Sequence, residues 1–252
     1  MDSSLEEAWL KLAHGRKHLD ALDAEFWRFH ADNSYTVVIE HDSDQSKYLA
    51  RFKVLKPMPQ HNWGLILGDA VHNARSALDY IAWRLAGSDP TDTKTQFPIC
   101  ADPTKFYSNR VRRMHPEVQT LIRDLQPYQR PDPYHHPLWL LQELDARDKH
   151  KLIAVTESFL GLQSISGKGQ MLIPYDTVIA PLQHNAILAE STDPNVEMEF
   201  EVAAFVVFDP NAIAAASGDY GVIRLVTQSF WAVETTIRFF ERIFMGCPHW
   251  IR

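Results

Sequence analysis

The segment Trp63–Ala86, with the sequence WGLILGDAVHNARSALDYIAWRLA, decides the fold because its apolar residues recur with the period of a long helix. On a helical wheel of about 100° per residue, these side chains fall on one side. They are Trp63, Ile66, Leu67, Ala70, Ala74, Ala77, Leu78, Ile81 and Leu85. We therefore predict a helix over about residues 61–86, whose small side chains allow another helix to approach closely.

The rest of the chain places helices at both ends and strands between them. Hydrophobic periodicity and turn residues predict the elements on either side of this helix. The expected helices cover residues 4–30, 116–125, 137–151 and 222–244, and the expected strands cover residues 35–41, 47–55, 152–162, 171–182 and 196–208. The prediction is a single α+β domain over residues 1–252: a helical bundle of long N-terminal, central and C-terminal helices packed on a mostly antiparallel β-sheet, with an N-terminal β-hairpin.

Composition narrows the class of protein. Of the 252 residues, 45% are hydrophobic and 23% are charged, as in an ordinary globular protein. The net charge of −7 disfavours a dedicated nucleic-acid binder, although a local basic patch stays open as an alternative. The polar start Met1–Glu7 is unlike a signal peptide, and no apolar run is long enough to cross a bilayer. We expect a cytoplasmic protein that does not enter a membrane.

The polar side of the 61–86 helix has an unusual composition for a solvated surface. Between Asp69 and Trp83 it contains neither Lys nor Glu, and it carries short acids, a histidine, an amide, a guanidinium, a hydroxyl and an indole. Such groups make directional hydrogen bonds. The spacing puts His72 and Asp79 two turns apart on one face, and Asp69 three residues before His72. This face indicates either an acid–base site or a polar network that ties the helix to its neighbours.

The predicted helix at residues 137–151 carries two acids on its apolar stripe. Asp145 and Asp148 share that stripe with several leucines, and a buried carboxylate is costly unless it is paired. Three residues are candidates for that pairing: His72, Arg75 and Lys149. The alternative is that both acids lie at the solvated end of the helix.

Together the two helices predict one constellation for acid–base chemistry on a small polar or anionic substrate. The expected catalytic residues are His72, Asp79, Asp69, Asp148 and His150, with Asp69 or Asp79 orienting His72. The expected substrate-binding residues are Asn73, Arg75, Tyr80, Trp83 and Lys149. The sequence contains no nucleotide-binding or zinc-protease motif, so we expect neither a cofactor nor a metal.

Several of these segments resemble a large group of uncharacterised bacterial proteins. The similarity rests on D-x-x-H-N-x-R-S-A-L-D at residues 69–79, Phe97-Pro-Ile, Gln126-Pro-Tyr and Asp148-Lys-His-Lys, and it covers most of the first 155 residues. The resemblance marks where a site lies, but it implies no activity.

A more distant similarity is to HEPN helical domains, which include ribonucleases with an Arg-x4-6-His motif. Arg110 and His115 have that spacing, but Val111 stands where a polar residue is usual, and the second half of the chain is rich in β-structure. Three functions follow as hypotheses: a hydrolase-like enzyme, a HEPN-like ribonuclease or defence component, and a non-catalytic binding module whose polar helix faces form a homodimer interface.

Overall fold

A computed structural model describes residues 5–32, 34–44, 46–89, 94–106, 110–151, 153, 155–168, 172–173, 183–208 and 221–246. The chain divides into two compact units. The helical unit contains Met1–Leu22, His61–Ala154 and Pro210–Arg252, and the sheet unit contains Asp23–Gln60 and Val155–Asp209. The sequence predicts one domain without such a division, and this stays a prediction.

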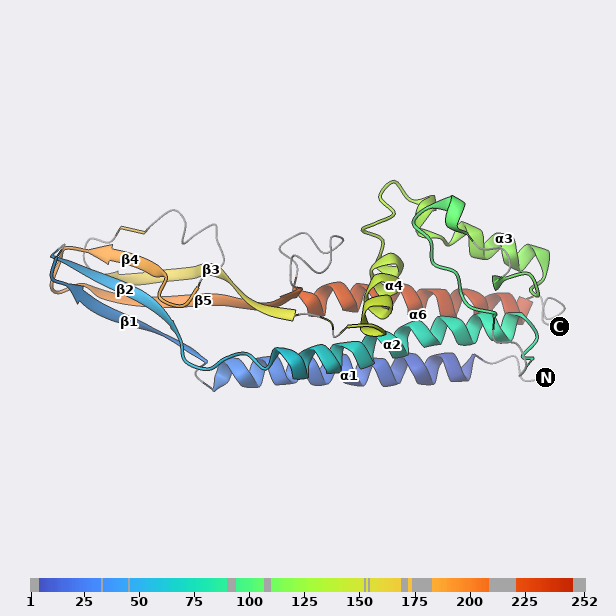
Figure 1. Cartoon of the computed structure of the whole chain (residues 1–252), viewed down its shortest axis with the longest axis horizontal. Helices are drawn as coiled ribbons and strands as arrows, with labels where there is room; N and C mark the ends of the chain where they lie inside the picture. The colour runs from blue at the N-terminus through green and yellow to red at the C-terminus, as the bar shows by residue number, and fades with distance from the viewer. Residues whose placement is uncertain are drawn as a thin grey trace. The chain divides into compact units, whose positions relative to one another are not determined.

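Helices predicted from the sequence form the helical unit (Figure 1). They are α1 (Glu6–Ala31, of which the part up to Leu22 belongs here), α2 (Gln60–Leu85), α3 (Pro116–Asp124), α4 (Pro137–Asp148) and α6 (Val222–Gly246). Single 3₁₀ turns cover Pro103–Lys105 and Pro127–Gln129. The ends agree with the predicted ends within a few residues because proline opens α3 and α4 and acidic residues occupy the first turn of α1.

The core of the helical unit lies where α1, α2 and α6 meet. Gly15 of α1 is so close to its neighbours that an added Cβ would lie 2.8 Å from the carbonyl oxygen of Ala70 and 3.1 Å from the ring of Phe230. The apolar stripe predicted for α2 is buried except for Ile66, which is half-buried, and it includes Trp63, which is 1% exposed. Glycine and alanine at this contact let the helix backbones approach one another, as the sequence predicted.

The sheet unit contains two antiparallel sheets. The first has the order β1–β2–β4, formed by Tyr35–Asp42, Lys47–Val54 and Ile187–Ser191, and the second pairs β3 (Val155–Lys168) with β5 (Glu197–Phe208). The predicted hairpin is confirmed, with Tyr35 opposite Val54. Phe200 of β5 packs on the core of the first sheet around Phe52.

These elements confirm the α+β class. The prediction of a single sheet is wrong because the described strands form two, and β4 was not predicted because its five residues give too short a pattern. Most of the strand expected at residues 171–182 lies outside the described residues, apart from a bridge between Leu172 and Glu190. The packing of the bundle on the sheet stays a prediction. Among the described residues, no helix combines the length and hydropathy needed to cross a membrane.

Candidate functional site

Helix α4 carries a buried carboxylate toward α2. His136 caps its N-terminus, where Nδ1 accepts a hydrogen bond from the backbone N–H of Leu138 at 3.2 Å. The leucines that follow on one stripe are buried, and Asp145 continues that stripe with only 1% of its surface exposed. A carboxylate in this position requires charged or hydrogen-bonding partners.

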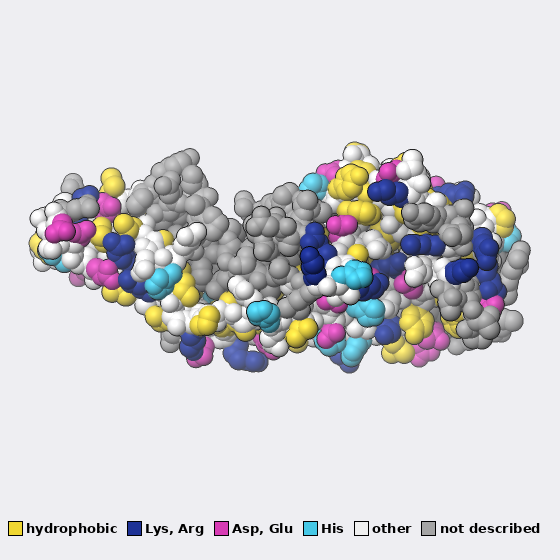
Figure 2. Space-filling view, viewed as in Figure 1, with side chains coloured by type: hydrophobic (Ala, Val, Ile, Leu, Met, Phe, Trp, Pro, Cys, Tyr) yellow, Lys and Arg dark blue, Asp and Glu magenta, His cyan; other side chains and the backbone are white. Residues whose placement is uncertain are grey.

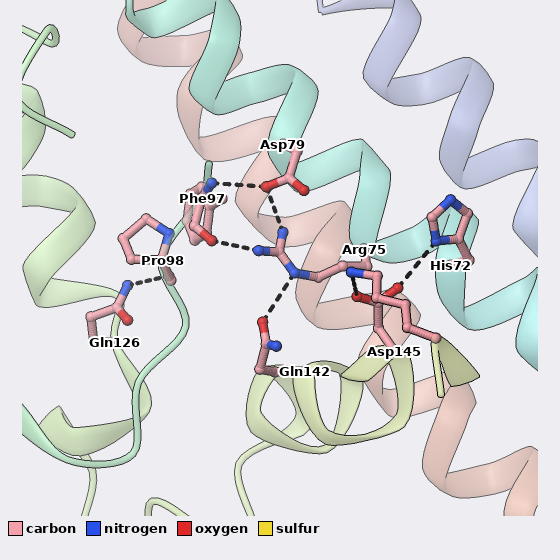
Figure 3. A network of polar contacts seen from close by, with 9 residues as sticks. His72, Arg75, Asp79, Phe97, Pro98, Gln126, Gln142 and Asp145 are labelled. Carbon is pink, nitrogen blue, oxygen red and sulfur yellow. Dashed lines mark hydrogen bonds and ion pairs between the residues drawn. The ribbon is translucent and has the colours of Figure 1, made fainter. Parts of the chain in front are cut away.

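Two side chains supply those partners (Figure 3). Nδ1 of His72, on α2, lies 3.2 Å from one carboxylate oxygen of Asp145, and Nζ of Lys149 donates to the other at 2.6 Å. This contact confirms the prediction that His72 and Lys149 balance a buried acid of α4. The alternative of two solvated acids is wrong for Asp145.

The contact also fixes the chemistry of His72. The sequence predicts that Asp69 or Asp79 orients this histidine, whereas the carboxylate that contacts it is Asp145 of α4. A carboxylate can only accept, so in the neutral imidazole the proton sits on Nδ1 and Nε2 keeps its lone pair. The side chain of His72 is 53% exposed, so this nitrogen is accessible to a ligand.

Asp148 lies one turn after Asp145 on α4, and its side chain packs against α2 at Gly68, which has no side chain. A Cβ added to Gly68 would lie 2.2 Å from one of its carboxylate oxygens and 2.7 Å from its Cγ. Gly68 is four residues before His72, so Asp148 lies about one helical turn from the histidine. Burial, and then the negative charges of Asp145 and Asp69, raise the pKa of Asp148 above its usual range, while His72 and Lys149 oppose this shift.

A pocket lies further along the same face of α2. Its volume is about 240 Å³, and it is lined by Ser76, Asp79, Tyr80, Trp83 and Thr95. Tyr80 and Trp83, two of the expected substrate-binding residues, both line this pocket, and their binding role stays a prediction. Ser76 follows His72 by four residues, so the pocket begins one helical turn from the histidine.

Arg75 and Asp79 form a structural network instead of a free acid–base pair (Figure 3). Arg75 donates to Asp79 at 2.8 Å, to the carbonyl oxygen of Phe97 at 2.8 Å and to Gln142 at 3.2 Å. The same oxygen of Asp79 accepts from the backbone N–H of Phe97 at 2.9 Å. With Arg75 only 5% exposed, its guanidinium fastens α2 to α4 and to the Phe97 segment. This geometry does not support the expected substrate contact of Arg75.

The remaining predicted residues lie around this arrangement in different roles. The amide of Asn73 donates to the carbonyl of Asp69 at 2.8 Å and accepts from Lys11 at 3.4 Å, so it joins α2 to α1. The Asp69 side chain is exposed and acts on Asp148 through its charge. His150 is exposed in the turn after α4, and within the described part of the chain no hydrogen bond or ion pair joins its side chain to the other expected catalytic residues.

The spacing shared with HEPN domains falls on a turn and a helix cap. His115 precedes α3, and its Nδ1 accepts from the backbone N–H of Glu117 at 3.4 Å. Arg110 has 3₁₀ geometry and is followed by a turn at residues 111–113. The two residues therefore do not share one helix.

Three contributors were missed as site residues: Asp145, Gly68 and Thr95. The burial of Asp145 on a leucine stripe was visible in the sequence, and it was the signal that should have ranked this residue above Asp79. Thr95 carries no such signal, because a loop brings it to the pocket from outside the helix.

Comparison with protein-family models, with curated proteins and with solved structures found no match. The arrangement of side chains therefore carries the functional argument alone. The similarity to uncharacterised bacterial proteins and to HEPN domains stays a prediction.

Proposed function

We propose that this chain is a hydrolase-like enzyme that uses acid–base chemistry on a small polar or anionic substrate. The observation that carries the proposal is the contact between the exposed imidazole of His72 and the buried carboxylate of Asp145. A histidine held in this way on a surface helix is an efficient general base, because its tautomer and its direction are fixed before substrate binds.

His72 is the base in this proposal. Its Nε2 takes a proton from an attacking water, and the imidazolium that forms is stabilised by Asp145, whose charge is already buried beside it. Lys149 donates to the second oxygen of Asp145, which holds the carboxylate in place. The Lys149 side chain is still 56% exposed, so it also contributes positive charge for an anionic substrate.

Asp148 is the acid. Its raised pKa increases the protonated fraction, which is the form that donates a proton to a leaving group. The bare backbone at Gly68 lets this carboxyl group lie against α2. Base and acid then come from two helices and lie about one turn of α2 apart.

The pocket beside Ser76 supplies the substrate site. A volume of about 240 Å³ corresponds to roughly eight water molecules, which suits a small substrate. Tyr80 and Trp83 offer apolar walls, while Ser76 and Thr95 offer hydroxyl groups. This mixture favours a substrate with one flat or apolar part and one polar group near His72.

The proposal is tested by hydrolysis of three chromogenic probes: a p-nitrophenyl phosphate, a p-nitrophenyl ester and a p-nitroanilide. We expect the wild-type chain to hydrolyse one of these classes, and His72→Gln to lower the rate by about 100-fold or more, the usual contribution of a general base. The control is His135→Gln, because His135 is also exposed and paired with an acid, Asp132, at 2.8 Å. A wild-type chain inactive on all three probes, or a His72→Gln variant as active as the control, would contradict the proposal.

A further inference from the structure

A second group of imidazoles lies on α1. His14 and His18 are four residues apart on this helix, and their Nε2 atoms are 3.3 Å apart. The ring centroids are separated by 4.8 Å, and the ring planes are nearly perpendicular, at 87°. His14 is exposed and His18 is half-buried, and Figure 2 shows histidine side chains gathered over the middle of the helical unit.

The separation of the two Nε2 atoms matches a metal-binding pair. Zinc binds imidazole nitrogen at about 2.0–2.1 Å in tetrahedral geometry, which places two such ligands roughly 3.3–3.4 Å apart. His14 and His18 already have this spacing, so a metal ion can contact both nitrogens without a change of backbone. A metal ion also accepts both lone pairs, whereas a hydrogen bond between the rings uses only one.

The helix beneath the pair is firmly held. Leu12 and Leu19 are 3% and 4% exposed, and Gly15 packs directly on α2. This packing fixes the positions from which the imidazoles project, so little backbone entropy is lost on metal binding.

Two cationic side chains near the histidine pair, Lys11 and Arg16, contact other residues. Lys11 donates to Asn73 at 3.4 Å, and Arg16 lies 3.5 Å from Glu234. The charge of Arg16 is thus partly compensated by Glu234, which lowers the repulsion that a divalent ion would meet from this side chain.

We propose that His14 and His18 form a two-histidine site for a divalent transition metal, with zinc as the first candidate. Imidazole nitrogen suits zinc, copper and nickel, and it discriminates against magnesium and calcium, which prefer oxygen. Among the described residues, no group of three or more metal-binding side chains occurs, so water completes the coordination. The open positions make this a site for exchangeable metal, and it is independent of the hydrolase proposal.

The test is calorimetric titration of the untagged full chain with zinc chloride, with magnesium chloride as the negative control. We expect one saturable zinc site, and a loss of about tenfold or more in affinity in both His14→Gln and His18→Gln. Two control variants are His135→Gln and His72→Gln, which alter exposed histidines outside the pair and leave the affinity unchanged.

A second measurement locates the ion directly. Proton–carbon NMR spectra of the imidazole rings should show His14 and His18 shifting together with zinc, in a one-to-one ratio. The absence of saturable binding, or zinc affinity that survives both substitutions, would overturn the proposal. Loss of zinc binding in His72→Gln alone would overturn it as well, because the ion would then belong to α2.

Discussion

The contact between Gly68 and Asp148 allows the acid of the proposed site to be displaced without unfolding the chain. In Gly68→Ala, the new Cβ would lie 2.2 Å from a carboxylate oxygen of Asp148. An ordinary contact of about 3.5 Å requires that oxygen to move by more than about 1 Å. Asp148 ends α4 and is half-buried, so its side chain can rotate outward into water.

The effect on stability should be small because two changes oppose each other. Alanine is favoured over glycine inside a helix by about 1 kcal/mol. Displacement of the carboxyl group removes its packing against α2 but also returns it to solvent. We expect a net change of at most about 1 kcal/mol in the free energy of unfolding, or about 2–4 °C in Tm for a chain of this size.

The ionisation of Asp148 should change much more clearly. Burial is the main cause of its raised pKa, so displacement into water should bring the pKa of this carboxyl group down toward its usual range. Carboxyl-carbon NMR titration of wild type and Gly68→Ala measures this directly. An unchanged pKa of Asp148 in the variant, with the fold intact, would refute the reasoning.

Three further outcomes are expected. Gly15→Ala is the matched comparison to Gly68→Ala, since its Cβ meets the backbone oxygen of Ala70 at 2.8 Å; thermal unfolding should show a loss of about 1–3 kcal/mol. The pKa of Asp148 is raised in the folded state, so the contribution of this group to stability is complete at acidic pH and is lost as pH rises through that pKa. In denaturant titrations, Asp148→Asn should therefore be more stable than wild type at neutral pH but not at acidic pH. Gln126 is 1% exposed, donates to the carbonyl oxygens of Pro98 and Ile122 and accepts from the backbone N–H of Cys100. By the same method, Gln126→Ala should lower the free energy of unfolding by about 2–4 kcal/mol. A decrease below about 0.5 kcal/mol, roughly the noise of such measurements, would contradict this structural role.

The helices were predictable because each carries a long periodic pattern with defined ends. The stripe of α2 extends over about six turns, and prolines mark the first residues of α3 and α4. Short elements lack that redundancy. The five residues of β4 are recognisable only through their pairing with β2, which depends on residues more than 100 positions away.

The candidate site was predictable in part, for the same reason. The two helices and the need of Asp145 for a partner follow from side-chain position and burial cost. Which carboxylate reaches which partner depends on how α4 crosses α2, and sequence spacing contains no information on that crossing. The predicted pairing of His72 with Asp79 is therefore wrong, because Asp79 accepts hydrogen bonds from Arg75 and from the backbone N–H of Phe97.

The direct test of the acid–base claim is the tautomer of His72 in solution. Long-range proton–nitrogen NMR spectra distinguish an imidazole protonated on Nδ1 from one protonated on Nε2. We expect neutral His72 to carry its proton on Nδ1, facing Asp145, and to lose this preference in Asp145→Asn. A neutral His72 protonated on Nε2 in the wild-type chain would leave no lone pair on this nitrogen to accept a proton, and would contradict the proposed role of His72 as the general base.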